Sequence, residues 1–510
     1  MQTSKGDHIG FWRIVARGLR EGRPLTKCLD QARSELAGTA WEAVCESAIR
    51  ALGEGATLSR ALQEHTELLD PRIIAAVTAG EEAGVLDVKA SEIAEALEAD
   101  DLDSLAGSGS PATLDAEAAE IADYVASVVR AAIEQRASDV HFEPCEGGGG
   151  RVRFRVDGVL YEVETIPGER HAKVAGRLKI MAGMDVAERR LPQDGRILLE
   201  ISGSRYDLRV STIPVIWGER IVCRVLARQN IPLGLENVGL SAEDMAKVEH
   251  LGGLPNGIVI VNGPTGCGKT TVLYSILLKI DRQSHCVLTV EDPVEVTFDG
   301  LSQMQIRPAI GMTFARAIRS MLRQDPDVIM VGELRDLEMM NLCVQVALTG
   351  HLLFTTLHAT TSVGAIRRLI DCGVEPFLIN SALAGVITPR LVRVLCTECR
   401  RPADPPADHL IPREAAKIIA GLPGATFYEP VGCDACAGTG YHGRTGIFEI
   451  LTMDDRIRQT VATPVDMAAM FNAARASGMK TMLADGLEKA ARGVTSVREV
   501  VRVVPQETHR

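Results

Sequence analysis

An eight-residue run in the middle of the chain has the residue types and spacing of a phosphate-binding loop. It fits the pattern GxxxxGK[ST] and consists of Gly263, Pro264, Thr265, Gly266, Cys267, Gly268, Lys269 and Thr270. An apolar run, 257–261, precedes it, and a predicted helix, 271–280, follows. In this setting glycines let backbone N–H groups turn toward phosphates, and the helix N-terminus adds positive potential. A chance glycine-rich turn is the competing interpretation.

We predict that this loop, together with Thr271, binds ATP and Mg²⁺. Lys269 would reach the β- and γ-phosphates, and the Thr270 hydroxyl would bind Mg²⁺. Cys267 occupies a variable position of the motif, where we interpret it as a small neutral side chain. A redox switch at Cys267 is the alternative.

Acidic residues follow two further apolar runs. The run 328–331 leads to Glu333, and the run 286–290 leads to Glu291. In P-loop folds the carboxyl ends of neighbouring strands face the nucleotide. We therefore predict Glu333 as the main catalytic carboxylate, which binds Mg²⁺ through water and orients the attacking water. Glu291 would help to position the metal or the water. The alternative for Glu333 is a surface charge at a strand end, and the alternative for Glu291 is an acidic turn.

Four of the twelve cysteines form two CxxC pairs. Cys396 pairs with Cys399, Cys433 pairs with Cys436, and residues 400–432 separate the pairs. Two such pairs supply four thiolates for a tetrahedral structural Zn²⁺, and a redox dithiol is the alternative. Because four protein ligands close a zinc site, we expect it to serve structure rather than catalysis.

The hydrophobic pattern predicts the elements that position these residues. Over 235–510, short apolar runs alternate with helical patterns, which indicates an α/β domain with a mainly parallel sheet buried on both faces. Within it, 390–450 would form the zinc subdomain, and helices would follow. Residues 114–230 indicate an α+β domain with a hairpin turn at Asp157-Gly158. Residues 1–100 have apolar positions at helical spacing, and a polar linker follows at 101–113.

Composition narrows the class of protein. The chain has 510 residues, enough for about three or four domains, and its 46% apolar residues are typical of a soluble globular protein. A net charge of −12 and 4% aromatic residues argue against a nucleic-acid partner. The cysteine pattern suits a reducing cytoplasm. We find no signal peptide, and the uncharged stretch 339–366 is too polar for a direct membrane span.

Residues 114–510 resemble the secretion ATPases of the GspE/PilB type, which drive type II secretion and type IV pilus assembly. The likeness extends beyond the phosphate loop to a series of segments in the family's order. These are 138–144, the RxPQDGR segment 190–196, 209–212, 218–220, the Asp box 291–295, the Walker B end 332–336, the His box 349–358 and 440–446. GspE and many PilB proteins also carry a tetracysteine subdomain.

The resemblance implies a homo-hexameric, RecA-like ATPase whose active site lies between the 114–230 domain and the ATPase domain. It places Arg209 and Arg224 at the γ-phosphate, where cations stabilise transition-state charge. Structural salt bridges are the alternative for both arginines. In the His box we favour His358 near the nucleotide and His351 in the sheet wall. For both residues the alternative is a histidine of the core whose hydrogen bonds are satisfied within the protein.

The N-terminal region departs from the family, whose members usually begin with a small domain that docks on a membrane-bound partner. Residues 9–98 resemble instead the cytoplasmic helical domain of GspF/PilC platform proteins, on the segments 19–29, 55–62 and 79–87. We interpret this region as a platform-like adaptor fused to the motor, and a generic helical bundle is the alternative. A second departure is Thr388-Pro389, where the family usually has Gln before Arg-Leu. Because proline lacks an N–H, we expect Pro389 to end the preceding helix.

Together these features predict a hexameric cytoplasmic ATPase that hydrolyses ATP to drive assembly of a type II secretion pseudopilus or a type IV pilus. Inner-membrane platform and docking proteins would be its partners and would hold it at the membrane. A related P-loop ATPase of DNA uptake or conjugative transfer is the alternative, and a non-hydrolysing scaffold is a third hypothesis.

Overall fold

The computed structural model divides into two compact units, 1–228 and 229–510, and each is described by itself. It describes residues 5–20, 23–53, 56–82, 86–102, 105, 111–168, 170–201, 204–227, 233–462 and 464–505. The predicted linker, 101–113, therefore lies partly outside the described residues, and 111–113 already belong to helix α8 (Pro111–Glu134). Residues 21–22, 55 and 83–85 of the platform-like segments are also outside them.

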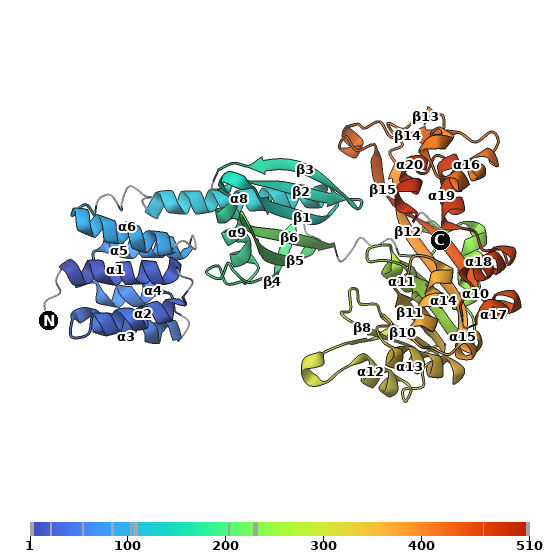
Figure 1. The fold of residues 1–510 in the computed structure, drawn as a ribbon, viewed down its shortest axis with the longest axis horizontal. Helices are drawn as coiled ribbons and strands as arrows, with labels where there is room; N and C mark the ends of the chain where they lie inside the picture. Colours follow the sequence, from blue (N-terminus) through green and yellow to red (C-terminus); the bar gives the residue numbers. More distant parts are fainter. Residues whose placement is uncertain are drawn as a thin grey trace. The chain divides into compact units, whose positions relative to one another are not determined.

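The elements of the described residues between 5 and 99 are all helices, as the periodicity predicts (Figure 1, blue). Phe11 stacks on Trp41 with ring centroids 4.1 Å apart, and Trp12 meets Phe11 edge-on at 4.9 Å. These three rings are almost wholly buried and belong to one shared core, to which each large aromatic side chain contributes a large buried area. The elements are α1 (Lys5–Arg20), α2 (Leu25–Glu35), α3 (Ala40–Gly53), α4 (Leu58–Leu62), η1 (Gln63–His65), α5 (Pro71–Glu82) and α6 (Leu86–Ala99).

Residues 111–227 form an antiparallel sheet with the strand order β3-β2-β1-β6-β5-β4 and two helices on one face. Alternate residues such as Val140, Phe142 and Leu208 are buried against these helices. Asp157 and Gly158 have φ of 48° and 84°, the left-handed pair that a two-residue hairpin needs, so the predicted turn is confirmed. The elements are α8, β1 (Ala137–Pro144), η2 (Glu146–Gly148), β2 (Gly150–Val156), β3 (Val159–Ile166), α9 (Arg170–Met181), β4 (Gln193–Ile201), β5 (Ser204–Val215) and β6 (Gly218–Ala227).

The second unit is built on a seven-stranded sheet with the order β15-β12-β7-β11-β10-β8-β9. The four predicted strands are present and pair in parallel, which confirms the α/β prediction. Ile258 and Val259 show why their run is continuously apolar, since they face separate cores on opposite sides of the sheet. The strands are β7 (Gly257–Asn262), β8 (Val287–Glu291), β9 (Ser302–Gln305), β10 (Val328–Val331), β11 (Leu352–Leu357), β12 (Leu383–Leu395) and β15 (Tyr441–Thr452).

Helices cover both faces of this sheet (Figure 1). Helices α10 and α11 contribute to one core, and α12 to α15 contribute to the other. The elements are α10 (Ala242–Gly252), α11 (Lys269–Lys279), η3 (Pro308–Ile310), α12 (Phe314–Met321), α13 (Leu337–Leu348), α14 (Ser362–Asp371) and α15 (Pro376–Ala382).

The expectation for Pro389 is wrong. Helix α15 already ends at Ala382, and Pro389 lies inside β12, where it pairs with Phe448 of β15. The pairing of β12 with β7 ends at Ile387, so the missing N–H of Pro389 takes nothing from that ladder. Proline is therefore tolerated in this strand, and Arg390 is fixed on a buried strand rather than at a helix end.

The C-terminal part has a small two-stranded sheet and helices. Buried Leu487 and Val500 pack α19 and α20 together with Phe427 of β14. The elements are β13 (Arg401–Ala403), η4 (Asp408–Leu410), α16 (Arg413–Ala420), β14 (Phe427–Glu429), η5 (Asp434–Cys436), α17 (Asp455–Thr460), α18 (Met467–Ala476), α19 (Met482–Ala491) and α20 (Val497–Val503).

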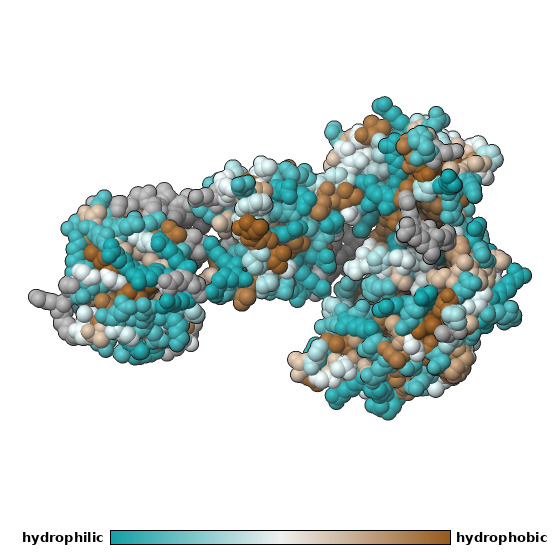
Figure 2. Space-filling view, in the orientation of Figure 1, coloured by the Kyte–Doolittle hydropathy of each residue, from teal (hydrophilic) through white to brown (hydrophobic). Residues whose placement is uncertain are grey.

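The surface carries mostly hydrophilic residues with scattered apolar patches in the view of Figure 2. Ile216 and Trp217, at the β5–β6 turn, are 93% and 56% exposed. In the part of the chain that the structure describes, we find no helix with the length and apolar character needed to cross a bilayer.

Candidate active site

The phosphate loop connects the end of β7 to the start of α11, as the motif predicts. Three of its glycines have positive φ: 142° at Gly263, 77° at Gly266 and 99° at Gly268. These conformations turn the backbone in ways that residues with a Cβ rarely adopt. At Gly263 space is also limiting, because a Cβ there would lie 2.6 Å from Nη1 of Arg390 and 2.7 Å from Sγ of Cys267.

Lys269 folds back over the loop. Its Nζ donates hydrogen bonds to the carbonyl oxygens of Gly263 at 2.7 Å and Pro264 at 2.9 Å. Burial lowers the pKa of Lys269, and the neighbouring Arg390 lowers it further. An ammonium held only by carbonyl oxygens can exchange them for phosphate oxygens, which bind it more strongly.

Glu333 follows β10 at the carboxyl edge of the sheet. One oxygen accepts a hydrogen bond from Nε of Arg335 at 2.5 Å, and the other lies 3.6 Å from Nε2 of His358. The charge of Glu333 also acts on Lys269 and raises its pKa. The structure thus brings together three predicted residues, namely Lys269, Glu333 and His358.

Arg335 is a site residue that the sequence reasoning missed. Besides Glu333, it binds Oδ2 of Asp292 through Nη2 at 3.1 Å, so it joins the acidic ends of β8 and β10. Its position two residues after Glu333 was the available signal, because side chains two apart in an extended segment lie on the same side.

Glu291 has different surroundings. Its carboxylate is 5% exposed and accepts hydrogen bonds from the Tyr274 hydroxyl, from Thr289 Oγ1 at 2.6 Å and from Gln303 Nε2 at 3.1 Å. Burial and the bond to Glu291 raise the pKa of Tyr274. Tyr274 lies on α11, so Glu291 ties the helix that begins with Lys269 to strand β8.

The two His-box histidines lie at opposite ends of β11. His351 precedes the strand, where its Nδ1 lies 3.1 Å from the carbonyl oxygen of Val346, and His358 follows it beside Glu333. Asn262, a second missed residue, is fully buried at the end of β7. Its Oδ1 accepts the N–H of Ala359 at 2.7 Å, which fixes the segment that carries His358 next to the phosphate loop.

Arg209 and Arg224 belong to the first unit, where they lie directly opposite each other on β5 and β6. Arg196 on β4 extends the row on the other side. Arg224 Nε donates to Asp139 at 3.0 Å, and Arg196 donates to Asp207 at 2.6 Å. Among the residues described, we find no hydrogen-bond or ion-pair partner for the exposed Arg209 side chain. Like charges facing each other across strands repel, so this row favours an anion.

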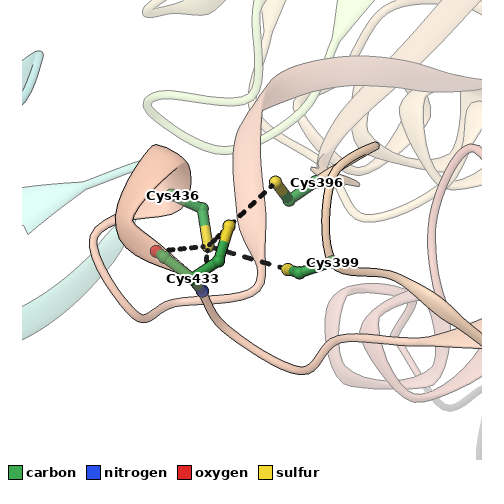
Figure 3. A group of neighbouring side chains, drawn as sticks. All are labelled: Cys396, Cys399, Cys433 and Cys436. Atoms are coloured by element: carbon green, nitrogen blue, oxygen red, sulfur yellow. Dashed lines mark hydrogen bonds between the residues drawn. The ribbon is translucent and has the colours of Figure 1, made fainter.

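The four cysteines converge from two separate loops (Figure 3). Their sulfur atoms all lie within 4.8 Å of one another, and the Cys396–Cys433 and Cys399–Cys436 distances are 3.8 and 3.9 Å. Four sulfurs at about 2.3 Å from a zinc ion would be about 3.8 Å apart in a tetrahedron. The residues therefore fit Zn²⁺.

Backbone N–H groups support the same cluster. Cys433 and Gly440 donate to Sγ of Cys436 at 3.2 and 3.1 Å, and Gly432 donates to Sγ of Cys399 at 3.3 Å. Burial acts to raise the pKa of the Cys436 thiol, but the N–H groups of Cys433 and Gly440 and the neighbouring thiols of Cys433 and Cys399 outweigh it and lower that pKa to about 7. A thiol that ionises near neutral pH is suited to bind a metal.

Known proteins resemble most of the chain. Residues 115–502 match the family model described as Type II/IV secretion system protein. The type II secretion system protein HxcR of Pseudomonas aeruginosa is 45% identical over 387 residues, which cover 76% of this chain and 78% of that protein. The type II secretion system ATPase E of Vibrio cholerae is 44% identical over 390 residues, with 76% of each chain covered.

A solved structure shows the same fold. The ATPase DotB of Legionella pneumophila superposes with a TM-score of 0.55 at 21% identity, over 74% of this chain and 94% of that one.

The N-terminal helices have a separate likeness. Residues 11–109 match a family model described as Type II secretion system (T2SS), protein F. This agrees with the predicted resemblance to platform proteins. By the family model over residues 115–502 and by its relatives, the chain belongs to the Type II/IV secretion system proteins.

Proposed function

We propose that this secretion ATPase hydrolyses ATP at the phosphate loop and uses the energy to drive assembly of a secretion pseudopilus or pilus. The observation that carries the proposal is the meeting of Lys269, Glu333 and His358 at one edge of the sheet. A group that can bind phosphate, a carboxylate that can activate water and a further polar side chain thus lie at the same edge of the sheet.

In this proposal residues 263–271 cradle the phosphates. Lys269 neutralises the β- and γ-phosphates, and Thr270 binds Mg²⁺. Glu333 orients the attacking water, and His358 lies beside the second oxygen of that carboxylate. Glu291 acts through Tyr274, because it fixes helix α11 and with it Lys269.

The rate of ATP hydrolysis by purified full-length protein tests the proposal. Lys269→Ala removes the cation that binds the phosphates, so turnover should fall to background. Lys279→Ala is the matched control, because Lys279 lies at the other end of α11 in a surface ion pair with Glu249. Lys279→Ala should retain turnover. Wild-type turnover in Lys269→Ala would overturn the proposal.

The proposed assembly is a homo-hexamer in which Arg209 and Arg224 reach the γ-phosphate. Arg209, for which the described residues offer no partner, and the row that it forms with Arg224 and Arg196 support this role. The mass of the Glu333→Gln variant with ATP, measured by mass photometry, should be about six times that of one chain. A monomer under these conditions would contradict the hexamer.

We further propose that the four cysteines hold a structural Zn²⁺. Removal of the zinc ion should destabilise the fold around the four cysteines, because their thiolates would then repel one another without the cation that binds them. A strong chelator, or Cys436→Ser, should lower the melting temperature, and metal analysis should find one zinc per wild-type chain. Cys286→Ser is the control, since Cys286 lies outside the cluster. Purified protein without bound zinc would contradict this assignment.

The helical N-terminal region is proposed to be an adaptor for membrane partners of the secretion machine, at the cytoplasmic face of the inner membrane. The match of residues 11–109 to protein F supports it. Full-length protein should capture a platform or docking protein from solubilised membranes. Capture at the same level by a variant that lacks residues 1–100 would contradict the adaptor.

A further inference from the structure

Asn262 lies where the phosphate loop and the turn that carries His358 separate from each other. It is the last residue of β7 and immediately precedes Gly263, the first residue of the loop. It pairs with Leu357, the last residue of the parallel neighbour β11. The N–H of Gly263 still donates to the carbonyl oxygen of Leu357 at 2.9 Å. Beyond this point one chain enters the phosphate loop, and the other enters residues 358–361, which we call the His358 turn.

The side chain of Asn262 continues the pairing where the backbone ladder of β7 and β11 stops. Its Oδ1 accepts the N–H of Ala359 at 2.7 Å, and its Nδ2 donates to the carbonyl oxygen of Thr361 at 3.0 Å. The same Nδ2 also donates to Oγ1 of Thr388 on β12 at 3.3 Å. Asn262 is fully buried, so a lost bond would leave a polar group of the turn unsatisfied in the interior. One amide group thus fixes the turn through both a donor and an acceptor.

Two other side chains hold the far end of the turn and the start of α14. Nη2 of Arg390 donates to the carbonyl oxygen of Thr360 at 3.0 Å. Oε1 of the buried Glu449 accepts the N–H of Ser362 at 2.7 Å. These anchors come from β12 and β15, so the fold of this segment does not depend on Asn262 alone.

We propose that Asn262 is a positioning residue for ATP hydrolysis, which sets the place of His358 relative to the phosphate loop. Its bond to Ala359 fixes the residue that directly follows His358. Nε2 of His358 lies 3.6 Å from the carboxylate of Glu333, so a shift of the turn would change the surroundings of the group that orients water. This inference rests on the proposed function of the site.

The test measures kcat and KM for ATP with purified full-length protein. Asn262→Ala removes the bonds to the His358 turn and places no charge near the phosphates. We expect kcat to fall about tenfold, because His358 is no longer held beside Glu333. KM should stay within about twofold of wild type, because the residues of the phosphate loop are unchanged.

A double-mutant cycle separates this role from a general loss of structure. If Asn262 acts through His358, Asn262→Ala should slow the His358→Ala variant by less than about twofold. An effect independent of His358 would instead slow both backgrounds by the same factor. Single-turnover rates make the comparison measurable in variants whose steady-state turnover is slow.

Asn380→Ala is the matched control. Nδ2 of Asn380, on α15, donates to the carbonyl oxygen of Arg458 at 3.1 Å, so this substitution also removes an amide–carbonyl bond, but one outside the phosphate loop and the His358 turn. It should lower the melting temperature and leave kcat unchanged.

The inference is overturned if Asn262→Ala retains the wild-type kcat or changes KM alone. It is also overturned if Asn262→Ala slows the His358→Ala variant as much as it slows wild type. A wild-type kcat in His358→Ala would leave Asn262 nothing to position, and an equal loss of kcat in Asn380→Ala would assign the effect to stability, so either result overturns it. If wild-type protein hydrolyses no ATP, the proposed function fails together with the inference. Normal hydrolysis by both wild type and Asn262→Ala overturns the inference alone.

Discussion

Glu333 and Glu291 follow neighbouring parallel strands of one sheet, yet their carboxylates have different partners. Glu333 is half-buried and contacts two cationic or titratable side chains, Arg335 and His358. Glu291 is buried and accepts three hydrogen bonds from neutral donors. Carboxylates at equivalent strand ends can therefore serve a ligand or hold the framework, and their partners distinguish the two.

The largest expected effect concerns Glu333. Glu333→Gln keeps the shape of the side chain but cannot attract Mg²⁺ or orient water as a carboxylate does. We expect turnover to fall about 10²- to 10⁴-fold while ATP still binds. Glu375→Gln, at an exposed carboxylate before α15, should leave turnover unchanged. Equal rates for Glu333→Gln and wild type would show that Glu333, like Glu291, does not take part in catalysis.

A smaller effect is expected at Arg335, which aligns Glu333. Arg335→Ala should lower kcat about tenfold, because the carboxylate loses the partner that fixes its position, with little change in KM. Arg335→Lys should recover part of the rate. A change confined to KM would assign Arg335 to substrate binding instead.

Glu291→Gln should act mainly on stability. Its amide group would face hydroxyl and amide donors that now donate to a carboxylate, so the free energy of unfolding should fall by about 1–3 kcal/mol. Turnover should fall only a few-fold, through looser placement of α11. Glu295→Gln, in the same acidic turn but exposed, is the control. A loss of turnover as large as that of Glu333→Gln would make Glu291 catalytic.

The smallest effect on activity is expected at Glu499, a buried carboxylate whose oxygens, like those of Glu291, already accept hydrogen bonds from the protein. Burial acts to raise its pKa, but the bonds from Arg502 and Arg393 prevail and hold that pKa at about 2, below the ordinary 4.5. Its stabilising contribution should be complete above pH 4.5 and decline as the pH falls toward 2, by at most about 1.4 kcal/mol per pH unit. Urea unfolding at a series of pH values measures this. Glu499→Gln should flatten the decline, and an unchanged slope would contradict the assignment.

The sequence was sufficient to predict the strand–loop–helix unit at Lys269, the four parallel strands and the cysteine cluster, because each depends on local spacing. It could not reveal the strand that contains Pro389. That strand depends on pairing with β15, in which Phe448, the partner of Pro389, lies 59 residues later in the chain. Asn262 was missed as a positioning group for a similar reason, since its partner Ala359 comes from a distant segment.

The most direct test of the central claim is a single-turnover measurement on Glu333→Gln and wild type with ATP and Mg²⁺. The bound nucleotide is identified after acid quenching. We predict that wild type converts bound ATP to ADP, whereas Glu333→Gln binds ATP and retains it intact. Conversion of ATP by Glu333→Gln at the wild-type rate, or intact ATP on wild type, would contradict the account.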